Sequence, residues 1–162
     1  MRHNTFLVHW NDSLTGDCLT KMVDIGGKDH VKRVAKASGF IELDSDTVDK
    51  IENDEIPKGD VKSVSKTAGV MAIKNTTQIV PLTHPIPITG ANVEIILQED
   101  GVKVEVGVKS RGQTGVEMEA LSGVNASLLT IWDMVKGFEK DEDGQYPGTR
   151  IRDVTVDEKV KE

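Results

Sequence analysis

Residues 93–108 read Val93-Glu94-Ile95-Ile96-Leu97-Gln98-Glu99-Asp100-Gly101-Val102-Lys103-Val104-Glu105-Val106-Gly107-Val108. On both sides of Asp100-Gly101, apolar side chains alternate with other residues. This pattern is typical of two half-buried β-strands joined by a tight turn. We therefore predict a β-hairpin here, and we assign the rest of the fold outward from it.

Two long amphipathic helices are predicted on either side of the hairpin. Before it, apolar residues recur at helical spacing from Asp60 to the stop before Pro81, and Pro85 and Pro87 hold the next segment extended. After it, Thr114-Gly115-Val116-Glu117 has the arrangement of a capping box, in which a hydroxyl is followed three positions later by an acid. The helix that begins there is expected to have an apolar stripe formed by Val116, Ala120, Val124, Leu128, Ile131, Val135 and Phe138.

The second helix also has a face of small residues, which comprises Ser122, Gly123, Ala126, Ser127 and Thr130. Small side chains allow another backbone to approach closely, so we expect this face to be covered as well. In a chain this short, another subunit is one candidate for that cover.

The remaining segments complete the predicted order. We interpret residues 19–25 as a strand ended by Gly26-Gly27, 31–38 as a helix ended by Gly39, 40–43 as a strand and 45–53 as a short polar helix. Apolar residues between 151 and 160 predict an irregular final strand. From residue 39 onward the order is strand, helix, strand, strand, helix, strand. The predicted class is thus α+β, a ferredoxin-like split βαβ fold with an antiparallel sheet and two long helices.

Length and composition limit the classes of protein. The 162 residues suit one domain, which we place at 19–162 after an N-terminal arm at 1–18. With 27 acidic and 20 basic residues the net charge is -7, which argues against nucleic-acid binding. No apolar run is long enough to span a bilayer, and the N-terminus lacks a signal-peptide pattern. The single cysteine, Cys18, fits a reducing compartment, so a cytoplasmic location without membrane contact is expected.

Three segments carry polar groups at positions fixed by helix ends or prolines. The first is Lys58-Gly59-Asp60, before the first long helix. A lysine beside a helix N-terminus suits phosphate binding, but Asp60 also suits the simple role of N-cap. The spacing alone favours the N-cap interpretation.

The second segment is Pro81-Leu82-Thr83-His84-Pro85. An imidazole held between prolines is suited to substrate hydrogen bonding or proton transfer near neutral pH. A loop histidine bonded to backbone carbonyls is an equally good interpretation. A metal site is not predicted, because no second histidine or cysteine lies at ligand spacing.

The third segment is the second long helix itself. Glu117 and Glu119 lie in its first turns, where acids commonly complement the helix dipole. Asp133 and Lys136 are three positions apart and share a face, for which a surface ion pair is the default interpretation. However, Asp133 is surrounded in sequence by apolar residues, and a half-buried acid–base pair has the shifted pKa values that acid–base catalysis uses.

These same segments resemble the molybdenum cofactor biosynthesis protein C family, the cyclic pyranopterin monophosphate synthases. The matching stretches are Met22-Val23-Asp24, Lys58-Gly59-Asp60-Val61, Pro81-Leu82-Thr83-His84-Pro85, Thr114-Gly115-Val116-Glu117-Met118-Glu119-Ala120-Leu121 and Leu129-Thr130-Ile131-Trp132-Asp133-Met134-Val135-Lys136. They keep the order and approximate spacing of the family from about residue 22 to 140.

The resemblance implies an enzyme that converts 3′,8-cyclo-7,8-dihydroguanosine 5′-triphosphate into cyclic pyranopterin monophosphate and pyrophosphate. It also implies a homohexamer, built as a trimer of dimers, with active sites at dimer interfaces. No cofactor is required, and Mg²⁺ is compatible with the triphosphate or the pyrophosphate. The implied catalytic residues are Asp133, Lys136 and Lys58, and the implied substrate-binding residues are Leu82, Thr83, His84, Met118, Glu119, Glu117, Arg33 and Lys74.

The chain also departs from the family pattern. Thr83 stands where many members have cysteine, and Lys66 stands where arginine is commoner. The glycine- and lysine-rich C-terminal motif of many bacterial members is absent, and Lys159 is the candidate for its lysine. This loss motivates the alternative hypothesis of a non-catalytic ferredoxin-like module that binds a nucleotide or pterin.

Overall fold

The computed structural model describes residues 20–162, so the predicted N-terminal arm lies outside the described residues. The elements follow in the order β1 (Val31–Glu42), α1 (Ser45–Glu52), α2 (Val61–Lys74), α3 (Thr76–Ile79), β2 (Ile88–Gln98), β3 (Gly101–Gly112), α4 (Glu117–Val135) and β4 (Arg150–Lys161). The strands form one sheet in the spatial order β2-β3-β1-β4, and every neighbouring pair is antiparallel. This confirms the predicted ferredoxin-like α+β fold.

The hairpin predicted from residues 93–108 is present as β2 and β3, which pair up to the turn where Gln98 lies opposite Gly101. The turn requires glycine at Gly101, because φ is 154° and a Cβ there would lie 2.0 Å from the carbonyl oxygen of Ile41. Four alternating valines of β3 are buried on the side of the sheet that the helices cover: Val102, Val104, Val106 and Val108.

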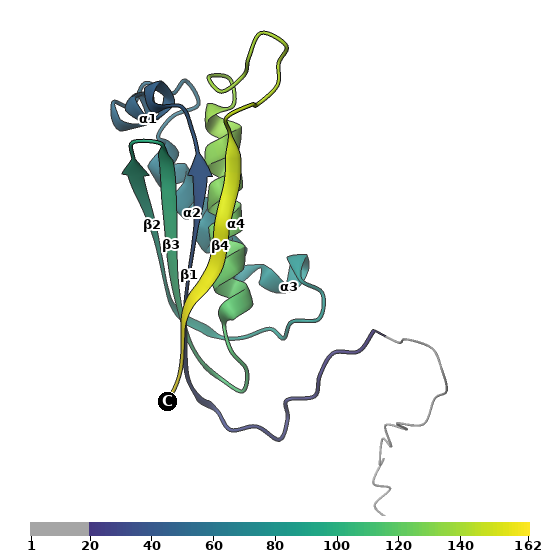
Figure 1. The fold of residues 1–162 in the computed structure, drawn as a ribbon. Coiled ribbons are helices and arrows are strands. Elements are labelled where there is room, and N and C mark those ends of the chain that lie inside the picture. The colour runs from purple at the N-terminus through teal and green to yellow at the C-terminus, as the bar shows by residue number, and fades with distance from the viewer. Residues whose placement is uncertain (1–19) are drawn as a thin grey trace, which may run out of the picture.

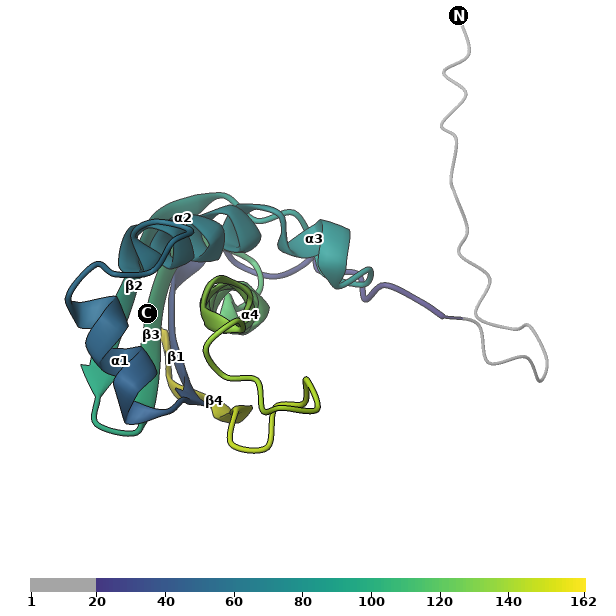
Figure 2. The same cartoon turned by 90° about the horizontal axis from the view of Figure 1, so that it is seen from above.

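The two long helices lie side by side on one face of this sheet (Figures 1 and 2). α2 lies over β2, and α4 lies over β1, β3 and β4. Their backbones approach closely where Gly69 of α2 meets α4, since a Cβ on Gly69 would lie 2.4 Å from Ser127 Oγ. The Ser127 hydroxyl donates a 3.0 Å hydrogen bond to the Ser65 carbonyl. Thus α2 of the same chain covers Ser127 and Gly123, and no second subunit is needed there.

Two predictions before residue 43 are wrong. Residues 31–38, interpreted as a helix, belong to β1, which runs on through Gly39 to Glu42. Val31, Val34 and Ala35 have helical spacing, but Val31, Ala35 and Ala37 also fit strand alternation, and pairing with β3 on one side and β4 on the other decides for the strand. Gly39 is not a helix stop but a contact point, because a Cβ there would lie 2.8 Å from Val124 Cγ1. Residues 20–25 form no strand.

The ends of both long helices also differ from the predictions. The first is interrupted at Asn75, whose side-chain Nδ2 donates to the Met71 carbonyl at 2.9 Å and so competes with the helical hydrogen bonds. The second is capped at Val116 without a side-chain hydrogen bond, so the predicted capping box at Thr114 is wrong. Phe138 lies beyond the end of α4 and is exposed, unlike the rest of the predicted apolar stripe.

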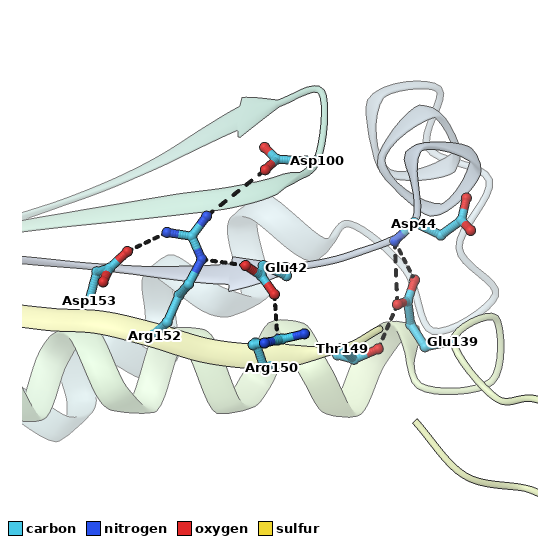
Figure 3. A network of polar contacts seen from close by, with 8 residues as sticks. All are labelled: Glu42, Asp44, Asp100, Glu139, Thr149, Arg150, Arg152 and Asp153. Atoms are coloured by element: carbon cyan, nitrogen blue, oxygen red, sulfur yellow. Dashed lines mark hydrogen bonds and ion pairs between the residues drawn. The ribbon is translucent and has the colours of Figure 1, made fainter. Parts of the chain in front are cut away.

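β4 is irregular, as predicted, with two register shifts against β1 and a positive φ at Asp153. A network of polar contacts secures its first residues (Figure 3). Glu42 of β1 accepts from Arg150 at 2.6 Å and from Arg152 at 2.5 Å. The Arg152 guanidinium also lies over the Phe40 ring and 3.9 Å from Asp100, so it connects β4 to the hairpin turn across β1.

In the part of the chain that the structure describes, no helix is long and apolar enough to cross a membrane.

Replacing Gly69 by valine is expected to destabilise the fold by about 1–3 kcal/mol, because the added side chain overlaps Ser127 and forces α2 and α4 apart. The matched control is Met71→Val on the same helix, where the side chain is 58% exposed and only helix propensity changes. Urea denaturation of both variants measures the difference. Equal stability of the two variants would contradict this view of the helix contact.

Candidate active site

Asp133, Lys58 and Lys136 meet at the C-terminal end of α4. The Asp133 carboxylate is paired with Lys58 Nζ at 2.8 Å through Oδ2 and with Lys136 Nζ at 2.8 Å through Oδ1. Lys58 Nζ also donates to the Asp133 backbone carbonyl at 2.6 Å, and this carbonyl belongs to the last turn of the helix. All three side chains remain about half exposed. The structure therefore brings together the three residues implied as catalytic.

Hydrogen bonds from Lys136 and Lys58 lower the pKa of Asp133 to about 2, and the positive charges of both lysines act in the same direction. The same hydrogen bond and charge raise the pKa of Lys136. The shift of Asp133 is thus opposite to the one that burial of an acid causes. At neutral pH the cluster contains one carboxylate and two ammonium groups, so it carries a net positive charge that suits an anion.

The loop before α2 explains why Lys58 points to Asp133. Gly59 has a φ of 104°, which favours glycine and turns the chain between Lys58 and the helix. Asp60 is the N-cap of α2 and accepts from the Ser63 amide at 3.1 Å. The N-cap interpretation of Asp60 is therefore confirmed, and Lys58 is directed to α4 rather than to the first turn of α2.

At the opposite end of α4 lies a cavity of about 490 Å³. Both stretches that were predicted to contact the substrate line it. The loop before β2 contributes Leu82, Thr83 and His84, and the start of α4 contributes Glu117, Met118 and Glu119. The Thr83 hydroxyl donates to the Val80 carbonyl at 2.8 Å, so it is already used in holding this loop. No hydrogen bond or ion pair of His84 is found within residues 20–162.

Glu117 and Glu119 both line this cavity, but their pKa values are shifted in opposite directions. Glu119 is 4% exposed, and burial together with the charge of Glu117 raises its pKa. For Glu117 burial acts in the same direction, but it is outweighed by the hydrogen bond and charge of Lys159 and by the charge of Arg33, so the pKa is lowered. A pair of neighbouring carboxyls with pKa values shifted apart is suited to different roles in proton transfer.

Lys74 and Arg33 lie around the same cavity without lining it. Lys74 ends α2 and lines a smaller cavity of about 90 Å³ together with His84 and Glu119, which border both spaces. Arg33 extends from β1 toward Gln113, whose carbonyl its Nη2 reaches at 3.4 Å, while its buried Nε has no partner. The structure therefore brings eight implied substrate-binding residues to one end of α4.

Sequence reasoning missed several residues of this end. Lys21 and Lys28 line the cavity, and the segment before β1 is held there by Gln113, whose Nε2 donates to the carbonyls of Lys28 and Gly26. Lys159 of β4, the candidate for the lysine of the C-terminal motif, pairs with Glu117 at 2.6 Å, a contact that the sequence did not predict. No periodicity in the sequence marks the positions of Lys21 and Lys28.

Within one chain the two clusters are far apart. α4 has 19 residues and spans about 28 Å, with the cavity at its start and Asp133 near its end. Figure 1 shows the same separation, because the loop after α3 lies beside one end of α4 and the loop before α2 lies near the other. Among the described residues, no three His, Cys, Asp or Glu side chains converge as a metal site.

The fold and these two clusters define a ferredoxin-like α+β protein with the acid–base and cationic groups of an enzyme. The sequence model of the MoaC family matches residues 22–161, so the chain belongs to the MoaC family. This family membership agrees with the resemblance inferred from the motifs.

Curated relatives agree with this family. A probable cyclic pyranopterin monophosphate synthase of Sulfurisphaera tokodaii is 51% identical over 87% of this chain and 93% of the relative. A probable cyclic pyranopterin monophosphate synthase of Archaeoglobus fulgidus is 51% identical over 90% of this chain and 93% of the relative. A protein of Methanothermobacter thermautotrophicus, named a probable cyclic pyranopterin monophosphate synthase accessory protein, is 49% identical over 87% and 89%.

Replacing Lys136 by glutamine is expected to raise the pKa of Asp133 from about 2 toward the ordinary value of 3.8, because the hydrogen bond that lowers it most and one positive charge are lost. A pH titration of the Asp133 carboxyl carbon by NMR measures this. Lys140→Gln, which removes a nearby lysine that makes no contact with Asp133, should leave the pKa near 2. An unchanged pKa in Lys136→Gln would show that the ion pair does not hold in solution.

Proposed function

We propose that this protein is a cyclic pyranopterin monophosphate synthase of molybdenum cofactor biosynthesis. It converts 3′,8-cyclo-7,8-dihydroguanosine 5′-triphosphate into cyclic pyranopterin monophosphate and releases pyrophosphate, as a phosphorus–oxygen lyase. The observation that carries the proposal is the Asp133–Lys58–Lys136 cluster in a chain of the MoaC family. The names of the curated relatives support it further.

The chemistry needs proton transfers during purine ring opening and pterin closure, and charge stabilisation as pyrophosphate leaves. Two ammonium groups held by one carboxylate supply both a proton donor and fixed positive charge beside a phosphate group. When substrate oxygens draw Lys58 or Lys136 away from Asp133, the cause of its low pKa is removed. Asp133 then becomes a stronger base at the moment a proton must be accepted.

The cavity at the start of α4 is the proposed site for the guanine-derived ring. Glu117 is the ionised acceptor for ring N–H groups, because its pKa is lowered. Glu119, with its raised pKa, and His84 are the groups for proton exchange with the ring. Lys74 and Arg33 are the proposed contacts of the triphosphate, and Leu82, Thr83 and Met118 complete the wall. No cofactor is required in this proposal, and Mg²⁺ is compatible with the oxygens of the triphosphate or the pyrophosphate.

A complete active site in this proposal takes groups from two chains. One substrate molecule does not span the length of α4, so the cavity of one subunit is matched with the Asp133 cluster of another. The proposed assembly is a homohexamer, a trimer of dimers with active sites at dimer interfaces, in the cytoplasm. The separation of the clusters within the chain supports this arrangement.

Purified protein given the cyclised GTP derivative is expected to release pyrophosphate and a pterin that becomes fluorescent on oxidation. Asp133→Asn should lower turnover by at least about 100-fold, because the acceptor for both lysines is lost. The control is Asp49→Asn, an exposed acid on α1 outside both clusters, which should keep wild-type turnover. Substrate binding without product from wild-type protein would instead favour the non-catalytic binding module.

Mixing two inactive variants tests the composite site. Co-expressed Asp133→Asn and His84→Ala chains form mixed dimers in which one of two sites carries neither change. With random pairing, activity is expected to recover to about a quarter of wild type. If both clusters acted within one chain, the mixture would stay as inactive as its parents.

A further inference from the structure

A second concentration of positive charge lies on the face of the sheet that carries no helices. There a cavity of about 570 Å³ is lined by three fixed cations, Lys32, Lys109 and Arg111, and by a single carboxylate, Glu162. The chain as a whole has a net charge of -7, so this local excess of cations runs against its composition. None of these residues belongs to the two clusters described above.

The sheet register places the cations on the same face. Lys32 of β1 lies directly opposite Arg111 of β3, and Lys109 is two residues before Arg111, so all three point to one side. Adjacent strands are about 4.8 Å apart and alternate residues about 7 Å apart, which brings the three side chains within reach of one ligand. Like charges directly opposite each other destabilise a sheet, so the arrangement has a cost that ligand binding would offset.

Most of this charge is not neutralised by the protein. Glu162 is paired with Lys32 at 2.5 Å. The side chains of Lys109 and Arg111 are exposed and make no hydrogen bond or ion pair with any part of the chain that the structure describes. On the same face Lys36 and Lys103 each have a glutamate partner at 2.6 Å. The unpaired state of Lys109 and Arg111 is therefore not a general property of this surface.

The edge strand is distorted at the same point. Pairing between β2 and β3 passes from Ile88 opposite Ser110 to Gly90 opposite Lys109, so Thr89 is the extra residue of a bulge. Thr89 lines the cavity, and its exposed side chain makes no hydrogen bond within residues 20–162. A bulge of this kind re-aims side chains at functional sites, and here it adds a hydroxyl donor beside the cations.

We infer that this cavity binds a small polyphosphate, with Lys109, Arg111 and Lys32 as cationic contacts and Thr89 as a hydroxyl donor. Arg111 provides a planar fork for two phosphate oxygens, and the lysines act as point charges on a neighbouring phosphate. Three cations spread over two strands fit a chain of phosphates better than a single one. The site is independent of the proposed synthase reaction, because it uses none of the residues assigned to that reaction.

The probe is inorganic pyrophosphate, titrated calorimetrically into the full chain. The Lys109→Gln/Arg111→Gln variant is expected to bind about tenfold or more weakly, because two charge-assisted contacts are lost. Glu162→Gln should bind more tightly, since Lys32 is then released from its partner. Lys103→Gln, which removes a paired lysine of the same face, should match wild type. The same titrations are repeated with Lys74→Ala added to each protein. This added change weakens pyrophosphate binding in the proposed active site and so separates it from binding in this cavity.

Three outcomes would overturn the inference. They are no pyrophosphate binding by the wild type, equal affinity of the wild type and the Lys109→Gln/Arg111→Gln variant, and binding of inorganic phosphate as tightly as pyrophosphate. A changed oligomeric state of the double variant with unchanged pyrophosphate affinity would instead make the cluster a protein contact. Because the readout is binding, loss of synthase turnover leaves the test unaffected, and failure here leaves the proposed function standing.

Discussion

The close contact between α2 and α4 is the constraint on which the rest of the structure depends. Gly69 leaves no room for a side chain between the helices, and Gly123 likewise lies against Ile73, with a would-be Cβ 2.9 Å from Ile73 Cγ1. Because the helices meet with the start of α2 beside the end of α4, Lys58 reaches Asp133. The end of α2 lies beside the start of α4, so Lys74 borders the same cavity as Glu119. One helix contact thus builds both clusters.

Charge in this protein is organised locally rather than by its total. The net charge of -7 describes the whole chain, yet Asp133 is held ionised by two lysines and Glu117 by Lys159. Glu119 lies two residues after Glu117, is more deeply buried and has no cationic partner among the described residues, so burial and the charge of Glu117 raise its pKa. The pKa of each carboxyl therefore follows from its burial and its nearest charged neighbours, which composition does not reveal.

Sequence patterns predicted the elements that depend on local alternation of apolar residues. They failed for elements whose type or ends are decided by pairing with distant strands or by helix caps. The hairpin around Gly101 was predictable because its alternation and turn lie in one short stretch. β1 was mistaken for a helix at 31–38, since Val31, Val34 and Ala35 have helical spacing and only pairing with the flanking strands decides for the strand. The Asp133–Lys136 pair was visible from spacing, whereas the link from Lys58 bridges distant parts of the chain. The contact of Lys159 with Glu117 depends on how β4 pairs with β1, for which the sequence has no local signal.

The C-terminal strand shows how the topology brings a lysine to the cavity at the start of α4. β4 pairs with β1 up to Lys161 and thereby reaches the end of the sheet beside the start of α4. In this register Lys159 lies opposite Ala35, which is buried under the helices, so its side chain is on the helix-covered face and pairs with Glu117. A lysine from the last strand therefore lies next to the cavity. A shift of β4 by one residue against β1 would move this cation to the other face of the sheet, so the register of the strand decides whether it reaches Glu117.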